Sequence, residues 1–332
     1  MIFALAAALS WGLADFLGAV STRRVGLLLT MCTGQVVTLV VLGFVAATLR
    51  SDNVHLSWGE LAALVLSGIL GAASYAGFYR ALQLGPVSLV SPVFSAYAAI
   101  TVLLAVVVGQ ESLAAAALAG IAATLGGVIL ASAAGRPPPA PGQVEPASGR
   151  PAPASGQVEP VPGRPAPTPG PVEAAPGPGG PAQRPGPAPR PHTSGIPYAL
   201  AAMVAWGVTT YILGRSAQRL GWFLPVAASR AVTLVILLAA AAAAALRHRL
   251  GRPRPRDLAL PAIAGLFDVL AFLAYTRGSQ GGSVSVTAAA SACFPLVVIA
   301  GGVLVFRERL RRIQIVGIGL TIAGLLVLGL AR

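Results

Sequence analysis

The stretch ASRAVTLVI, residues 228–236, is an altered copy of TGQVVTLVV, residues 33–41. The copy lies 195 positions later, and the same distance separates SWGLADF, residues 10–16, from AWGVTTY, residues 205–211. Because both stretches recur in the same order at the same distance, the chain is predicted to be an internal duplication.

The composition predicts an integral membrane protein. Of the 332 residues, 55% are hydrophobic and only 10% are charged, and the mean hydropathy is +0.78. All 23 basic residues are arginines, and the net charge of +13 lies mostly between apolar runs. This distribution is typical of anchoring at the membrane interface, so we expect a lipid bilayer and no nucleic acid as partner.

Ten apolar runs are long enough to cross a bilayer as helices, which takes about 20 residues each. The first begins at the initiator methionine without a basic segment before it or a small-residue cleavage site, so we expect it to be a permanent helix. The predicted spans are 2–20, 27–48, 58–80, 86–108, 113–133, 196–214, 222–246, 257–276, 283–305 and 313–330.

The segment between the fifth and sixth spans, residues 135–195, holds 20 of the 28 prolines and almost no large apolar residue. Such a segment cannot bury a core, so we predict a disordered, extended linker. The predicted units are therefore a first five-helix repeat at 1–134, the linker at 135–195, and a second five-helix repeat at 196–332. A docking strip for a proline-recognising partner is the alternative interpretation of the linker.

The number of spans in each half predicts how the two halves are oriented. Because five is odd, the second half must lie upside-down relative to the first, with a pseudo-two-fold axis in the membrane plane. The predicted fold class is thus an all-α membrane protein of ten transmembrane helices, arranged as two inverted repeats. This architecture is typical of secondary transporters.

The duplicated motifs resemble the EamA repeats of the drug/metabolite transporter superfamily, over nearly everything but the linker. The resemblance implies a central substrate cavity and the movement of small metabolites such as amino acids, often outward. The motifs that carry it are a Trp-Gly pair in the first span of each half, Arg80 with Gly85-Pro86, Ser91-Pro92, Glu111, Gly120, Arg307-Glu308-Arg309-Leu310, Gly317 and Gly324. One departure is Gln110-Glu111-Ser112, where the family usually has Gly-Glu-Arg.

Arg230 is a permanent charge inside the seventh predicted span, at the position that Gln35 occupies in the first half. A charge well inside a span costs about 2.5 to 3.5 kcal/mol, so it should face the bundle interior. Three interpretations stay open. Arg230 binds a carboxylate or phosphate of the substrate, or it pairs with an aspartate and only joins helices, or it extends to the nearby interface.

Two aspartates inside spans are the other candidate site residues. Asp15 lies in the first span opposite Thr210 of the second half, and Asp268 lies in the eighth span opposite Gly71 or Ala72. Because neither has a charged counterpart, both are candidates to carry a proton or to bind an amine.

Aromatic, amide and proline side chains complete the candidates. Gln35, Trp11, Trp206, Tyr79 and Tyr275 are candidates to line the cavity, although aromatic residues near span ends more often form interfacial belts. The predicted helix hinges are Pro86, Pro92 and Pro295. We also expect Glu111 and Glu308 to complement the dipole of the helix that follows each, and the glycines of the fifth and tenth spans to allow close packing.

The sequence thus predicts a multi-pass protein of the cell membrane that moves a small amino-acid-like or amphipathic metabolite, outward, by alternating access. No cofactor, metal or catalytic residue is predicted, and proton coupling is one option. No ATP-binding loop of the Walker kind is present. The alternatives are a non-transporting scaffold or sensor that uses the linker to bind a partner, and an intramembrane enzyme.

The orientation of the termini is left open by two opposing indications. With cytoplasmic termini, short loops and tails would place five arginines inside and twelve outside, against the positive-inside rule. The family resemblance implies cytoplasmic termini.

Overall fold

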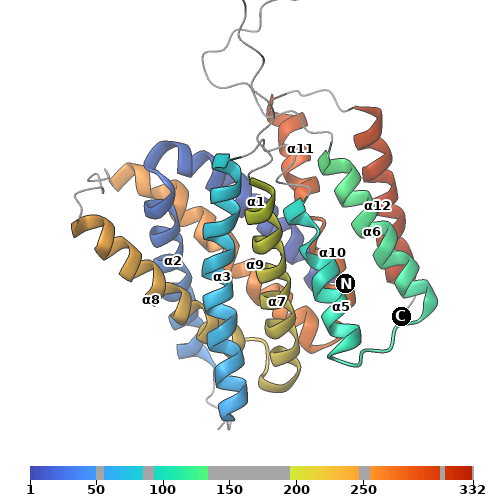
Figure 1. Ribbon diagram of the computed structural model, residues 1–332, viewed down its shortest axis with the longest axis horizontal. Coiled ribbons are helices and arrows are strands. Elements are labelled where there is room, and N and C mark those ends of the chain that lie inside the picture. The colour runs from blue at the N-terminus through green and yellow to red at the C-terminus, as the bar shows by residue number, and fades with distance from the viewer. Residues whose placement is uncertain (50–55, 85–92, 134–194, 247–254, 307–310, 331–332) are drawn as a thin grey trace, which may run out of the picture. The chain divides into compact units, whose positions relative to one another are not determined.

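The computed structural model describes residues 1–49, 56–84, 93–133, 195–246, 255–306 and 311–330 (Figure 1). The first half contains α1 (Ile2–Val25), α2 (Leu27–Thr48), α3 (Trp58–Leu84), α5 (Tyr97–Val107) and α6 (Ala115–Ala133). The second half contains α7 (Ile196–Leu220), α8 (Leu224–Leu246), the short 3-10 helix η2 (Pro255–Leu258), α9 (Ala259–Gln280), α10 (Val284–Ser291), α11 (Phe294–Phe306) and α12 (Arg312–Leu330). The predicted linker lies outside these residues, apart from Gly195.

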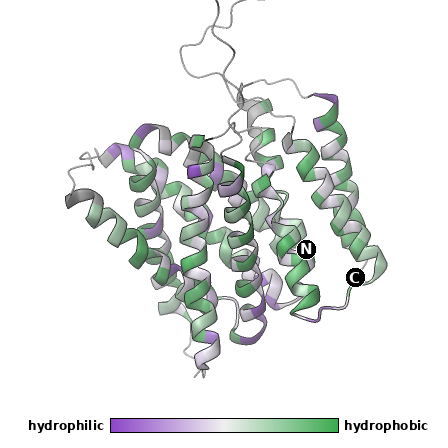
Figure 2. Ribbon diagram, viewed as in Figure 1, coloured by the Kyte–Doolittle hydropathy of each residue, from purple (hydrophilic) through white to green (hydrophobic). Residues whose placement is uncertain are grey.

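The predicted membrane-spanning character is confirmed. Within the described ranges, eight helices are long and apolar enough to cross a bilayer, and two shorter apolar helices, Val93–Val107 and Val284–Val297, fall in the fourth and ninth predicted spans. Figure 2 shows apolar residues along the lengths of the helices, with hydrophilic residues gathered toward their ends. The all-α fold class predicted from the sequence is therefore correct.

The fourth and ninth spans are each broken at the same point of the repeat. The helical residues 93–95 and α5, which begins at Tyr97, are separated by Ala96, and α10 and α11 are separated by Ala292 and Cys293. The amide of Ala96 donates to the carbonyl oxygen of Val93 at 3.3 Å, and the amide of Cys293 donates to that of Ala290 at 3.4 Å. Residues 96 and 293 are 197 positions apart, so the break belongs to the repeated unit.

Reciprocal helix packing relates the two halves by a pseudo-two-fold axis. A Cβ atom at Gly12 of α1 would overlap Val297 of α11, and a Cβ atom at Gly207 of α7 would lie 2.6 Å from Cβ of Ile100 in α5. Gly207 is the repeat counterpart of Gly12, and Ile100 is the repeat counterpart of Val297. The first contact therefore corresponds to the second when the two halves are interchanged. Such exchange requires a two-fold relation, and five spans per half make the repeat an inverted one.

Two hydrogen bonds from threonine hydroxyl groups show the same two-fold relation elsewhere in the bundle. Thr38 of α2 donates to the carbonyl oxygen of Gly265 in α9 at 3.5 Å, and Thr233 of α8 donates to that of Gly68 in α3 at 3.1 Å. The helix pairs α2–α9 and α8–α3 are thus equivalent. Their glycines let the backbones come close enough for a side chain to reach a carbonyl oxygen on the next helix.

Equivalent glycines also turn the chain between the first two helices of each half. Gly26 follows α1 with φ 83°, and Gly221 follows α7 with φ 80°. A positive φ is strained for residues with a Cβ atom, so glycine is the residue that both turns require.

The pair α6 and α12 packs through the glycines that the sequence singled out, and the two helices lie side by side in Figure 1. A Cβ atom at Gly127 would lie 2.5 Å from the backbone nitrogen of Thr321, and one at Gly317 would overlap Ala131. The neighbouring Gly126 is exposed, and its Cβ atom would meet nothing closer than 3.9 Å. Close packing at these glycines is therefore confirmed.

We predict that Gly127→Ala destabilises the protein by about 1 to 3 kcal/mol, because the added methyl group would force α6 and α12 apart. Gly126→Ala is the matched control and should be neutral or slightly stabilising, since alanine favours a helix more than glycine does. The measurement is the thermal unfolding midpoint of detergent-purified protein. Equal midpoints for the two variants would contradict the packing described.

Arg24 and Arg219 are exposed repeat counterparts, just before Gly26 and Gly221. In an inverted repeat they emerge on opposite sides of the membrane. We therefore expect Arg24→Cys and Arg219→Cys, each made in a Cys32→Ala and Cys293→Ala background, to react with a membrane-impermeant maleimide from opposite sides. Labelling of both from the same side would rule out the inverted arrangement.

Candidate substrate site

The centre of the repeat interface lies where α2 meets α8. The side-chain amide of Gln35 donates to the carbonyl oxygen of Arg230 at 3.1 Å, and both residues are only 5% exposed. Gln35 and Arg230 are repeat counterparts, and counterparts touch each other only near the axis that relates them. The two residues that the sequence aligned therefore lie together at the pseudo-two-fold axis.

Arg230 forms an ion pair with Asp268 in the bundle interior. Nη2 of Arg230 lies 3.1 Å from Oδ2 of Asp268, and their side chains are 6% and 19% exposed. The same nitrogen has no acceptor in hydrogen-bond geometry, so the contact is ionic without an aligned N–H. Of the three interpretations of Arg230, internal pairing is the one present in this structure, and the guanidinium does not extend to the interface.

Other side chains hold this ion pair in place. The guanidinium of Arg230 stacks over the ring of Phe272, with its carbon 3.7 Å from the ring centroid. The hydroxyl group of Tyr75 donates to Oδ1 of Asp268 at 3.4 Å. A cation over an aromatic face is attracted to the ring electrons, which favours this position for Arg230.

Four aromatic rings surround the centre in a symmetric set, which we call the aromatic box: Trp11, Tyr75, Trp206 and Phe272. Trp11 meets Phe272 edge to face at 5.1 Å, and the counterpart pair of Trp206 and Tyr75 meets edge to face at the same distance. Trp206 also meets Phe272 at 5.8 Å. Both tryptophans are buried, so the interfacial-belt alternative does not apply to them.

Asp15 brings a second carboxylate to this region. It is exposed on α1, and it lies close enough to Asp268 for the two carboxylates to interact electrostatically. Asp268 therefore lies between a partner cation, Arg230, and a second carboxylate, Asp15. An accessible carboxylate beside a buried ion pair is suited to binding a cationic group or a proton.

The remaining predicted site residues are placed as follows. Tyr275 is fully buried and donates to the carbonyl oxygen of Thr210 at 3.0 Å, so its hydroxyl group is engaged within the bundle. Pro295 is the second residue of α11, directly after the break in the ninth span. The side chain of Tyr79 and the prolines Pro86 and Pro92 lie outside the described part of the chain.

Phe272, which lies under the guanidinium of Arg230, was not among the predicted site residues. Two signals were present. Phe272 is the repeat counterpart of Tyr75, and it follows Asp268 by four positions, which places both on one face of α9.

Glu111 differs from the prediction. Its carboxylate does not cap the helix that follows it, but accepts the amides of Val284 and Ser285 at the start of α10, at 2.8 and 3.1 Å. Glu111 does place an anion at a helix N-terminus, as predicted, but the helix is α10 of the second half rather than the helix that follows Glu111.

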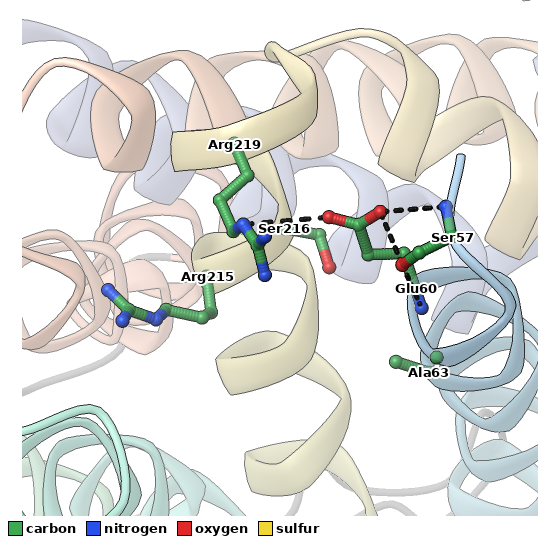
Figure 3. A pocket seen from close by; sticks show the side chains of 7 residues that line it. Ser57, Glu60, Ala63, Arg215, Ser216 and Arg219 are labelled. Atoms are coloured by element: carbon green, nitrogen blue, oxygen red, sulfur yellow. Dashed lines mark hydrogen bonds and ion pairs between the residues drawn. The ribbon is translucent and has the colours of Figure 1, made fainter. Parts of the chain in front are cut away.

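Glu60 lies in a surface pocket of about 260 Å³ where α3 begins and α7 ends (Figure 3). Glu60 accepts the amide of Ser57 at 3.0 Å and lies 3.5 Å from Nε of Arg219. The guanidinium of Arg219 is largely exposed, so this ion pair contributes little to stability and contrasts with the buried pair of Arg230.

Comparisons with known proteins agree with the duplicated helical fold. A model of the EamA-like transporter family matches residues 1–133 and 193–330, one match for each half. No curated protein matches the chain. A solved structure described as "Crystal structure of protein" is similar in fold, with a TM-score of 0.69 and 18% sequence identity over 99% of this chain and 96% of the other.

We predict that Arg230→Gln or Asp268→Asn alone costs about 3 kcal/mol of unfolding free energy, because each leaves the other charge buried without a partner. The double variant should recover most of that loss. Unfolding of detergent-purified protein would give the coupling energy through a double-mutant cycle. Additive effects of the two substitutions would show that the ion pair is not a coupled unit.

Proposed function

Because the chain belongs to the EamA-like transporter family, we propose that it moves a small metabolite out of the cell by alternating access around the site at Arg230. One observation carries this proposal. A buried guanidinium lies at the pseudo-two-fold axis with an N–H that has no aligned acceptor. Sites on the axis between inverted repeats are reached equally from both faces, which is what alternating access requires.

The substrate class follows from the charges around the axis. Arg230 binds a carboxylate or phosphate of the substrate, since the guanidinium is a planar fork that matches such groups. In the absence of substrate, Asp268 forms the ion pair with Arg230. The anionic group of the incoming substrate displaces Asp268 from this pair. The displaced carboxylate is then neutralised by a proton or by a cationic group of the substrate, because an unpaired charge inside the bundle is costly.

Asp15 supplies the second recognition element. It is accessible and near Asp268, so it binds the amine of a zwitterionic substrate or exchanges a proton with Asp268. The aromatic box packs the apolar part of the substrate, and the amide of Gln35 fixes the backbone at Arg230. An amino-acid-like metabolite satisfies all of these groups at once.

The two broken helices provide the moving parts. At each break the backbone hydrogen bonds of Ala96 and Cys293 reach back only three residues, which makes these positions the points about which the span can bend. Discontinuous helices at equivalent positions of inverted repeats favour exchange between two states related by the pseudo-two-fold axis, one open to each face. Pro295 restricts the backbone at the start of α11, where the second break ends.

We expect Arg230→Lys to lower flux of a carboxylate substrate by about tenfold, the scale of one lost charge-assisted hydrogen bond. Lysine keeps the charge that faces Asp268, so the fold is retained, but it lacks the planar fork. The assay is uptake of labelled amino acids and other small metabolites into liposomes that hold the purified protein. Arg219→Lys, at the exposed ion pair, is the matched control and should leave flux unchanged.

Flux through Arg230→Lys equal to that of the parent protein would remove Arg230 from substrate recognition. Absence of flux for every metabolite, by parent protein that is folded and inserted, would instead favour the scaffold or sensor role.

A further inference from the structure

The carboxylate of Glu111, in the first half, caps the N-terminus of α10 in the second half. Oε1 of Glu111, in the connection between α5 and α6, accepts the amide of Val284 at 2.8 Å. Oε2 accepts the amide of Ser285 at 3.1 Å and the hydroxyl group of the same serine. Hydrogen bonds to a charged acceptor are stronger than neutral ones, and an anion at a helix N-terminus is further favoured by the helix dipole.

This contact completes the cap of α10. The third amide, that of Val286, donates to the hydroxyl oxygen of Ser283 at 3.1 Å, so α10 itself satisfies one of its first three N–H groups. Glu111 satisfies the other two. If Glu111 moved away, the amides of Val284 and Ser285 would need water, and this end of α10 would have to be exposed.

The residues at this contact and on its inner side are tightly packed. Val284 is 2% exposed, and a Cβ atom at Gly214 of α7 would lie 2.8 Å from its side chain. Further inward, Ser279, Thr210 and Tyr275 are fully buried. These residues separate the contact from the aromatic box, so the site is closed toward this end of the bundle.

The outer side of the contact is open to water. A pocket of about 300 Å³ lies there, and both Glu111 and Val284 belong to its lining, together with Gln110, Tyr211, Arg215 and Gln218. Gln110 has a φ of 54°, a conformation that is strained for a residue with a side chain and persists only where the surroundings hold it. This conformation belongs to the turn that ends α5, where the backbone amide of Glu111 donates to the carbonyl oxygen of Ala105 at 3.0 Å.

We propose that Glu111 is the latch of the gate on this face of the transporter. With the latch closed, its carboxylate joins the α5–α6 connection to α10 and keeps the pocket apart from the central site. Opening requires both hydrogen-bonded amides to be released together, after which the pocket and the central site form one path. This inference rests on the alternating access proposed above, and it assigns a residue that touches no substrate.

The test is the reactivity of a cysteine placed on the inner side of the latch. Ser279→Cys is nearly isosteric and fully buried in the latched state, and Cys32→Ala with Cys293→Ala removes the native thiols. We expect Glu111→Gln to raise the labelling rate of this cysteine by about tenfold, because the amide offers one acceptor oxygen and no charge. The rate is measured with an impermeant maleimide in intact cells and in inverted vesicles, and it should rise from one side only.

Two further variants make the result specific. Ser285→Ala removes only the hydroxyl donor and should raise the rate by a smaller factor, and it serves as the milder perturbation if Glu111→Gln folds poorly. Glu308→Gln changes the repeat counterpart of Glu111 and should not raise labelling from the same side. The latch is overturned if neither Glu111→Gln nor Ser285→Ala changes the rate, or if Glu308→Gln has the same effect from that side.

The labelling result is separate from the flux result. If the rate rises as expected while no substrate is moved, the gate exists and the proposed transport fails. If flux is found and the rate is unchanged, transport stands and the latch fails.

Discussion

The buried guanidinium of Arg230 is the constraint around which the centre of this protein is organised. A permanent charge inside lipid must be compensated by the protein, and here a carboxylate and an aromatic face from α9 both compensate it. That requirement joins α8 to α9 at the pseudo-two-fold axis, where the two repeats meet. Nη2 of Arg230 lies within ion-pair distance of Asp268 without an aligned hydrogen bond, and the proposed role in binding a substrate anion rests on this geometry.

The duplicated architecture and the site follow opposite rules. Packing contacts, helix breaks and turn glycines occur in counterpart pairs, because both halves are built from the same unit and must satisfy the same backbone requirements. The charges at Arg230, Asp268 and Asp15 have no charged counterparts. Symmetry thus belongs to the helical scaffold, whereas asymmetry belongs to the charged groups that we propose to recognise the substrate.

Most of the fold was predictable from the sequence, and part of the site was not. Apolar length determines which segments cross lipid, and the offset between copies identifies Gln35 as the counterpart of Arg230. The break in the ninth span was not predicted at Cys293, because a run such as AAASACFP looks continuous by hydropathy alone. The partner of Glu111 was also missed, since helix capping was inferred from chain neighbours, while the helix start that it caps is 173 positions away.

By itself, the sequence determined that the chain crosses a membrane, that it is duplicated and inverted, and which residues inside the spans carry charge. These properties depend on local composition and on the order of motifs along the chain. Only the tertiary structure decided that Arg230 pairs with Asp268, that Phe272 lies beneath the guanidinium, and that Glu111 caps α10. Each depends on which helix faces meet, and several faces of comparable apolar character compete for every neighbour until the whole bundle is packed.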